Sequence, residues 1–423
     1  MWPRLAKALV VTGILISTAS AADTSPSLTF EDCLNAALSR NEDLGEQREL
    51  VFQADQRSRQ AKGSIFPTIE AVASHLWQDS AETGIGRSIA PRTQPLLRIS
   101  ATQPLFRGLR EFAALRQSRH LTDAQRYELR NAERLLHASL ARSFYTILSL
   151  ESQISNFEHE ISLIRRRIQE LKNRKRIGRS RSSEVLNVET SLATTQAELE
   201  RIRSLLQPER ENLSFLTGLS PLVSIHDPLL KQINADSPLP ELAVYLQKME
   251  ERFDIKADAE RRNAASESVR IARGAHFPEI DLSANYYLER SGALEAAKWD
   301  VQIELTLPIY SGGVTQSRVR EAGSVLSQSE YSLAGTRRRA HQEITSLHQE
   351  WGLTRTRLKT LTKALTLAER NYAEQTREYR LGLVTNLEVL QALTTRAEIT
   401  RSVDQTRIEL KLLLERLKAA AII

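Results

Sequence analysis

Apolar residues recur in heptads along most of the chain. From Leu109 to Lys175 there is no proline and no glycine, and eight successive a and d positions are apolar. These positions are Ile147, Leu150, Ile154, Phe157, Ile161, Ile164, Ile168 and Leu171. An a/d repeat of this length is typical of a coiled coil, so it predicts a helix of roughly 65 residues, on the order of 100 Å long. Such a helix is much longer than an ordinary domain.

The heptad pattern predicts four long helices, over about 108–176, 182–217, 312–381 and 386–420. A short turn containing Gly178 joins the first two, and a turn containing Gly382 joins the last two. Each pair is therefore expected to form an antiparallel helical hairpin whose tip lies far from the rest of the chain.

Other segments alternate between apolar and polar residues. From Trp299 to Leu307 every second residue is apolar, and the same alternation follows Pro278. This pattern predicts strands over about 278–290 and 298–309, with weaker counterparts over about 66–78 and 95–105. It suits either a half-buried soluble sheet or a membrane barrel with a wet lumen. Four strands cannot close a barrel, and open edges are not tolerated in hydrocarbon, so a membrane barrel would need several chains.

The chain contains two copies of one design. The stretch Ala61–Ile69 recurs 211 residues later as Ala272–Ile280, and the Gly178 turn recurs 204 residues later at Gly382. We predict a first repeat over 22–220, a proline-containing linker over 221–240 and a second repeat over 241–423. Residues 1–21 have the basic start, apolar centre and A-x-A end of a secretory signal.

Composition limits the possible functions. Aromatic residues make up only 5% of the chain, and 58 Lys and Arg nearly balance 52 Asp and Glu, which does not indicate nucleic-acid binding. The lone Cys33 cannot form an internal disulfide, and we expect it to be packed on an amphipathic helix. His341 and His348 lie near Glu343 and Glu350, but their seven-residue spacing makes a poor metal site. No phosphate-binding loop or plausible nucleophile motif is present, so the sequence offers little support for an enzyme.

Several short motifs occur in a fixed order. They are Leu28-Thr29-Phe30-Glu31-Asp32, the Phe66-Pro67 and Phe277-Pro278 strand entries, Pro308-Ile309-Tyr310-Ser311-Gly312-Gly313, and the second turn from Tyr379 to Leu390. Together with the duplication, they resemble the TolC-like outer-membrane factors of efflux pumps and type I secretion systems. The fold class expected from this resemblance is mainly α with a small β part, in two tandem repeats of a β-hairpin and a long helical hairpin.

The resemblance implies a homotrimer in the outer membrane that binds no cofactor and catalyses no reaction. Each subunit would give four strands to a lipid-embedded barrel, and the helices would continue it as an α-helical barrel through the periplasm. The helical tips would form the entrance and meet a periplasmic adaptor, which joins them to an inner-membrane pump or ABC transporter. The residues expected at the tips are Gly178, Arg179, Gly382, Leu383, Val384 and Thr385.

Two glutamates are candidates for a constriction at the entrance. Glu184 and Glu388 follow the two tip glycines by the same six residues, and rings of carboxylates select for cations and bind divalent ions. A simpler role is open to Glu388, because Thr385-Asn386-Leu387-Glu388 is also a capping box. In the first turn, Arg181 occupies the position of the capping threonine, three residues before Glu184. The first tip is rich in arginine, and a run of charge of this kind is typical of a solvated surface.

A second class of protein also fits part of the pattern. A periplasmic coiled-coil adaptor or scaffold without a pore would explain the signal and the helices, but not the duplicated strands. Within the channel interpretation, the cargo stays open between small molecules and polypeptides.

Overall fold

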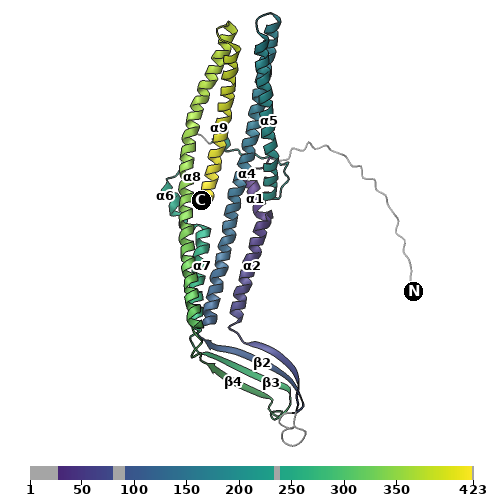
Figure 1. The fold of residues 1–423 in the computed structure, drawn as a ribbon, viewed down its shortest axis with the longest axis vertical. Coiled ribbons are helices and arrows are strands. Elements are labelled where there is room, and N and C mark those ends of the chain that lie inside the picture. Colours follow the sequence, from purple (N-terminus) through teal and green to yellow (C-terminus); the bar gives the residue numbers. More distant parts are fainter. Residues whose placement is uncertain (1–26, 80–90, 233–238, 422–423) are drawn as a thin grey trace, which may run out of the picture.

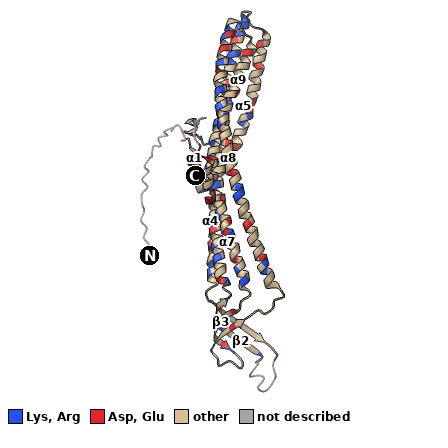
Figure 2. Ribbon diagram, turned by 90° about the vertical axis from the view of Figure 1, so that its left-hand side faces the viewer, with Lys and Arg blue, Asp and Glu red and all other residues tan. Residues whose placement is uncertain are grey.

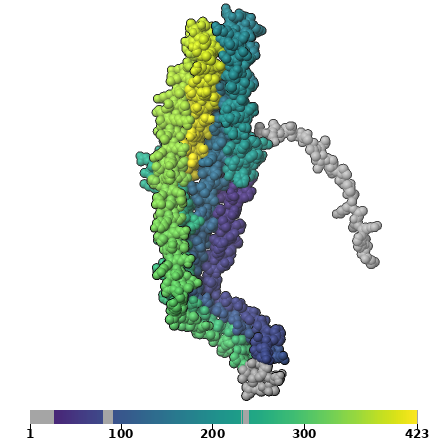
Figure 3. Space-filling view, in the orientation of Figure 1, coloured from purple at the N-terminus to yellow at the C-terminus, as the bar shows by residue number. Residues whose placement is uncertain are grey.

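The computed structural model describes residues 27–79, 91–232 and 239–421, so the expected signal over 1–21 lies outside the described residues. The molecule is elongated, with a sheet at one end and two helical tips at the other (Figures 1 and 3). No helix in these ranges is both long and apolar enough to cross a membrane.

The two copies contain the same kinds of helices and strands in the same order. The first contains α1 (Phe30–Arg40), α2 (Glu42–Gly63), β1 (Thr68–Trp77), β2 (Thr93–Arg107), α4 (Arg110–Arg176) and α5 (Ser182–Thr217). The second contains α6 (Leu242–Gln247), α7 (Phe253–Gly274), β3 (Glu279–Arg290), β4 (Trp299–Thr306), α8 (Val314–Leu381) and α9 (Asn386–Ala421). Short 3-10 turns, η1 (Leu230–Gln232) and η2 (Met249–Glu251), lie between α5 and α7. The predicted fold class is confirmed, whereas α2 and α7 are helices that the sequence pattern did not reveal.

Two helices span the whole helical part of the molecule. Near the sheet, α4 packs against α2 and α7, and α8 packs against α7; near the tips, α4 packs against α5 and α9, and α8 packs against α9 (Figure 1). Of the eight predicted heptad positions in α4, all but the half-buried Ile154 are buried. The heptad pattern therefore buries its apolar stripe against the neighbouring helices.

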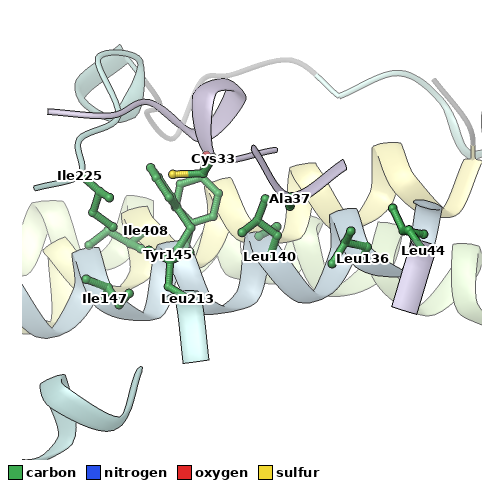
Figure 4. Packing of buried hydrophobic residues seen from close by; sticks show 12 residues of the cluster. Cys33, Ala37, Leu44, Leu136, Leu140, Tyr145, Ile147, Leu213, Ile225 and Ile408 are labelled. Atoms are coloured by element: carbon green, nitrogen blue, oxygen red, sulfur yellow. The ribbon is translucent and has the colours of Figure 1, made fainter. Parts of the chain in front are cut away.

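The middle of the molecule holds a compact apolar cluster. Cys33 on α1 is fully buried there, beside Tyr145 and close to Ala37 and Leu140 (Figure 4). Burial raises the pKa of the Cys33 thiol to about 11, so the side chain stays protonated near neutral pH. Cys33 is thus a packed apolar residue, as the sequence indicated.

The four strands form one antiparallel sheet in the order β1-β2-β3-β4. The register pairs Leu282 with Ile303 and Ala284 with Val301, so the alternating apolar residues share one face. That face is exposed in the single subunit; Ile303, for example, is 68% exposed. Within this sheet, β1 and β4 each pair along one side only, which leaves two open edges.

The copies meet where the sheet joins the helices. Gly108 precedes α4 with φ +65°, and a Cβ added there would lie 2.2 Å from the carbonyl oxygen of Gly274 at the end of α7. Beside this crossing, Arg107 forms an ion pair with Asp281 at 2.8 Å, and Arg110 forms one with Glu279. Only glycine allows the two backbones to approach this closely.

Candidate functional site

Both helical tips use the same backbone turn. In the first, the Arg179 amide donates to the carbonyl oxygen of Arg174 at 2.9 Å, around Gly178 at φ +75°. In the second, the Leu383 amide donates to the carbonyl oxygen of Glu378 at 3.0 Å, around Gly382 at φ +80°. Glycine adopts this left-handed conformation at little cost, and the bond satisfies an orphan carbonyl at the end of each helix.

The start of α9 is capped by Glu388. Its carboxylate accepts hydrogen bonds from the Thr385 backbone amide at 2.6 Å and from the Thr385 hydroxyl at 2.9 Å. The backbone bond and then the hydroxyl bond lower the pKa of Glu388, which keeps it charged at neutral pH. The capping role predicted for Glu388 is therefore confirmed.

The start of α5 is built differently. Arg181 occupies the N-cap position but makes no side-chain capping bond. Glu184 instead accepts a hydrogen bond from the hydroxyl of Ser180, four residues earlier. The sequence argument left Glu184 without a local partner, and Ser180 is that partner.

The two hairpins are fastened together close to the tips. The Arg167 guanidinium of α4 lies 3.9 Å from the ring centroid of Tyr379 in α8, and its Nε donates to Oδ1 of Asn386 in α9 at 2.8 Å. Tyr379 is also part of a buried cluster shared by α4, α5, α8 and α9. Sequence reasoning missed this contact, since its partners are more than 200 residues apart and Arg167 resembles its arginine neighbours.

The predicted tip residues lie at the far end of the molecule from the sheet. Gly178, Arg179, Gly382 and Thr385 are exposed, Leu383 is 71% exposed and Val384 is half-buried. Glu184 and Glu388 lie one on each tip, at the start of the returning helix. The structure thus gathers these residues into two neighbouring tips that face solvent (Figure 1).

One of the two histidines considered as metal ligands, His348, has a structural role. The imidazole Nε2 of His348 lies 3.1 Å from the Pro240 carbonyl oxygen, and its ring packs on Tyr245 of α6. Across the described ranges, no group of three or more His, Cys, Asp or Glu side chains is placed to hold a metal ion.

A family model named outer membrane efflux protein matches the chain twice, over residues 33–219 and 244–420. The chain belongs to this family. The two matched segments correspond to the two copies of the design, so the duplication is visible in sequence, structure and family comparison alike. Members of the outer membrane efflux protein family are channels rather than enzymes.

Curated relatives of this outer membrane efflux protein match it at low sequence identity but over most of its length. Outer membrane efflux protein BepC of Brucella suis is 22% identical over 91% of this chain and 84% of its own length. Outer membrane protein TolC of Escherichia coli is 20% identical, over 82% of this chain and 72% of its own length.

Solved structures share the fold. CusC, whose structures concern folding and transmembrane channel formation, superposes with a TM-score of 0.82 at 18% identity, covering 93% of this chain and 91% of that one. The outer membrane protein VceC from Vibrio cholerae gives a TM-score of 0.82 at 20% identity, covering 93% of this chain and 95% of that one.

Family membership decides between the two classes of protein left open by the sequence. This outer membrane efflux protein is a channel subunit of the outer membrane, and its helical part lies in the periplasm. The interpretation as a scaffold without a pore finds no support.

Proposed function

We propose that three copies of this chain form one export duct, which works with a periplasmic adaptor and an inner-membrane transporter to export small molecules or polypeptides. The open edges of β1 and β4 carry this proposal. An unpaired strand edge is costly in a bilayer, and pairing β4 of one subunit with β1 of the next would satisfy both edges. The exposed apolar face of the sheet would then meet lipid.

Repeat symmetry supports a closed ring. Within one chain Gly108 crosses Gly274, and the counterparts of these glycines in the other copy are Gly312 and Gly63. A Cβ added at Gly312 or Gly63 meets no atom of the chain within 4 Å. In a ring, Gly312 would cross Gly63 of the partner subunit as Gly108 crosses Gly274. Every place where the sheet joins the helices would then have one pair of crossing glycines, either within a subunit or between two subunits.

The tips would form the entrance to the duct. Three subunits would bring three copies each of Glu184 and Glu388 to this end. Glu388 is charged and exposed in addition to its capping role. We infer that these carboxylates line a constriction which favours cations and binds divalent ions.

Planar-bilayer recordings test both the channel and its constriction. The purified protein should conduct with a preference for cations. The double variant Glu184→Lys with Glu388→Lys should shift the selectivity toward anions and weaken block by divalent ions, because lysines replace the carboxylates. Glu388→Gln alone should mainly affect the stability of the helix start, because a neutral amide oxygen accepts the two Thr385 hydrogen bonds more weakly than a carboxylate does.

Glu369→Lys is a suitable control, since Glu369 is exposed on α8 several turns from the tip and forms no ion pair among the described residues. It should leave selectivity and block close to wild type. Unchanged ion selectivity and unchanged divalent block in the double lysine variant would show that neither glutamate lines the constriction. Helix capping and surface charge would then be their only roles. A preparation of folded wild-type protein that never conducts would contradict the duct itself.

A further inference from the structure

The two tips share a backbone turn but carry different charges. From Lys172 to Arg181, six of ten residues are Lys or Arg and none is acidic. The equivalent stretch of the second tip, 376–385, contains two arginines and one glutamate. Figure 2 shows basic residues gathered at this end of the molecule. The duplicated design has therefore diverged at the part that faces away from the membrane.

Most of the basic side chains of the first tip are free to meet a partner. Lys175, Arg176, Arg179 and Arg181 are all exposed. In the described part of the chain, Lys175, Arg179 and Arg181 form no ion pair, whereas Lys172 is paired with Glu189 at 2.8 Å. The charge on this surface is thus largely uncompensated within the subunit.

Helix stability explains only part of this charge. Arg174, Lys175 and Arg176 lie in the last turn of α4, where cations interact favourably with the helix dipole. Arg181 lies at the opposite kind of position, the N-cap of α5, where a cation is unfavourable and makes no capping bond. Since Thr385 fills this position in the second copy, Arg181 replaces a residue that would stabilise the helix. Arg181 is thus an N-cap residue that does not stabilise its helix, and residues that break such a local preference are typical of binding sites.

The second tip presents apolar side chains instead. Leu381, Leu383 and Leu387 are 68%, 71% and 62% exposed. When the two turns are aligned on their glycines, Leu383 takes the place of Arg179. A partner that touches both tips would therefore meet a cationic surface on one and an apolar surface on the other.

We propose that the first tip binds an acidic polypeptide segment carried by the periplasmic adaptor. This inference rests on the proposed function and specifies the chemistry of its partner. In a trimer, three basic tips would alternate with three apolar tips, so an acidic segment would dock at every second position. Charge complementarity would place each acidic segment on a basic tip. It would exclude the arrangement in which the adaptor is shifted by one tip and the acidic segments lie on apolar tips, because unpaired charges at an interface are costly.

Site-specific photo-crosslinking in the native host can test the proposal. A photoreactive benzoylphenylalanine placed at Ile177, which is 67% exposed on the first tip, should crosslink to a protein segment rich in Asp and Glu. The same probe at Leu381 on the second tip should crosslink to a segment without that acidic character. Peptide mapping by mass spectrometry identifies both segments.

A charge-reversed variant gives the comparison. Arg179→Glu with Arg181→Glu should lower the Ile177 crosslink on the order of tenfold or more, because like charges would then face each other. The variant should fold normally, since glutamate near the start of α5 favours the helix. Arg380→Glu, an exposed reversal on the second tip, should leave the Ile177 crosslink unchanged.

The outcomes separate this inference from the proposed function. A neutral or basic partner segment, a crosslink only to lipid, an undiminished crosslink in the reversed variant, or no protein crosslink at all would each overturn the acidic partner. In every one of those cases the purified protein could still conduct in bilayers. Loss of conductance by the wild-type protein would instead overturn the duct.

Discussion

Replacing Gly108 with alanine should prevent most subunits from reaching the folded state. A Cβ at this position would lie 2.2 Å from the Gly274 carbonyl oxygen, a backbone atom that no rotamer change can move. Alanine would also have to adopt φ near +65°. Strain and overpacking together should cost roughly 2–6 kcal/mol, a large part of the stability of a typical protein. Far-ultraviolet circular dichroism during heating of the purified variant, and its yield in the outer-membrane fraction, would measure the loss.

Gly312→Ala is the matched variant at the equivalent turn of the second copy. Its φ of +63° imposes the same backbone strain, but the added Cβ meets no atom of its own chain within 4 Å. It should leave the folding of the subunit much closer to wild type. If Gly312 crosses Gly63 of the partner subunit, the variant should instead weaken assembly. Equal thermal stability of the two alanine variants as dissociated single subunits, where only Gly108 meets another glycine, would show that the Gly108 crossing is unimportant.

Gly382→Val should abolish export while the protein still inserts into the outer membrane. Valine is disfavoured at φ +80°, and the strain of about 1–3 kcal/mol falls on the turn that the Gly382 and Leu383 amides close. This cost is too small to unfold α8 and α9, which pack extensively against each other and against α7 and α4, but it is large enough to displace the tip. Cells whose only copy is the variant should fail to release a compound that wild-type cells are first shown to export, as completely as cells that lack the gene.

Gly382→Asn provides the control, because asparagine tolerates the left-handed conformation better than other non-glycine residues. It should retain most of the export. Wild-type export by a normally assembled Gly382→Val protein would exclude a role for the conformation of this turn.

Long-range periodicity made the main elements predictable. The heptads of α4 extend over many turns without proline or glycine, and the alternation in β3 and β4 is nearly unbroken. In α2, by contrast, only Leu44 and Ala54 are buried, so no apolar stripe reveals the helix. The order of the strands in the sheet could not be predicted from a local pattern either, because β2 and β3 pair although they come from different copies.

The candidate site was only partly predictable for a related reason. The turn glycines and the Thr385–Glu388 cap are local in sequence, so spacing alone identifies them. The contact of Arg167 with Tyr379 and Asn386 depends on how two distant hairpins pack, and no spacing encodes it. The role of Ser180 depends on a rotamer of Glu184 that a sequence does not specify.

The mass of the particle extracted from the outer membrane tests the central claim most directly. Mass photometry of the wild-type protein in mild detergent counts the chains in each particle, independently of cargo, adaptor or transporter. Because the open edges of β1 and β4 must be paired between subunits, we expect one species with the mass of three chains plus bound detergent. A stable, folded monomer as the main species would contradict this account of the channel.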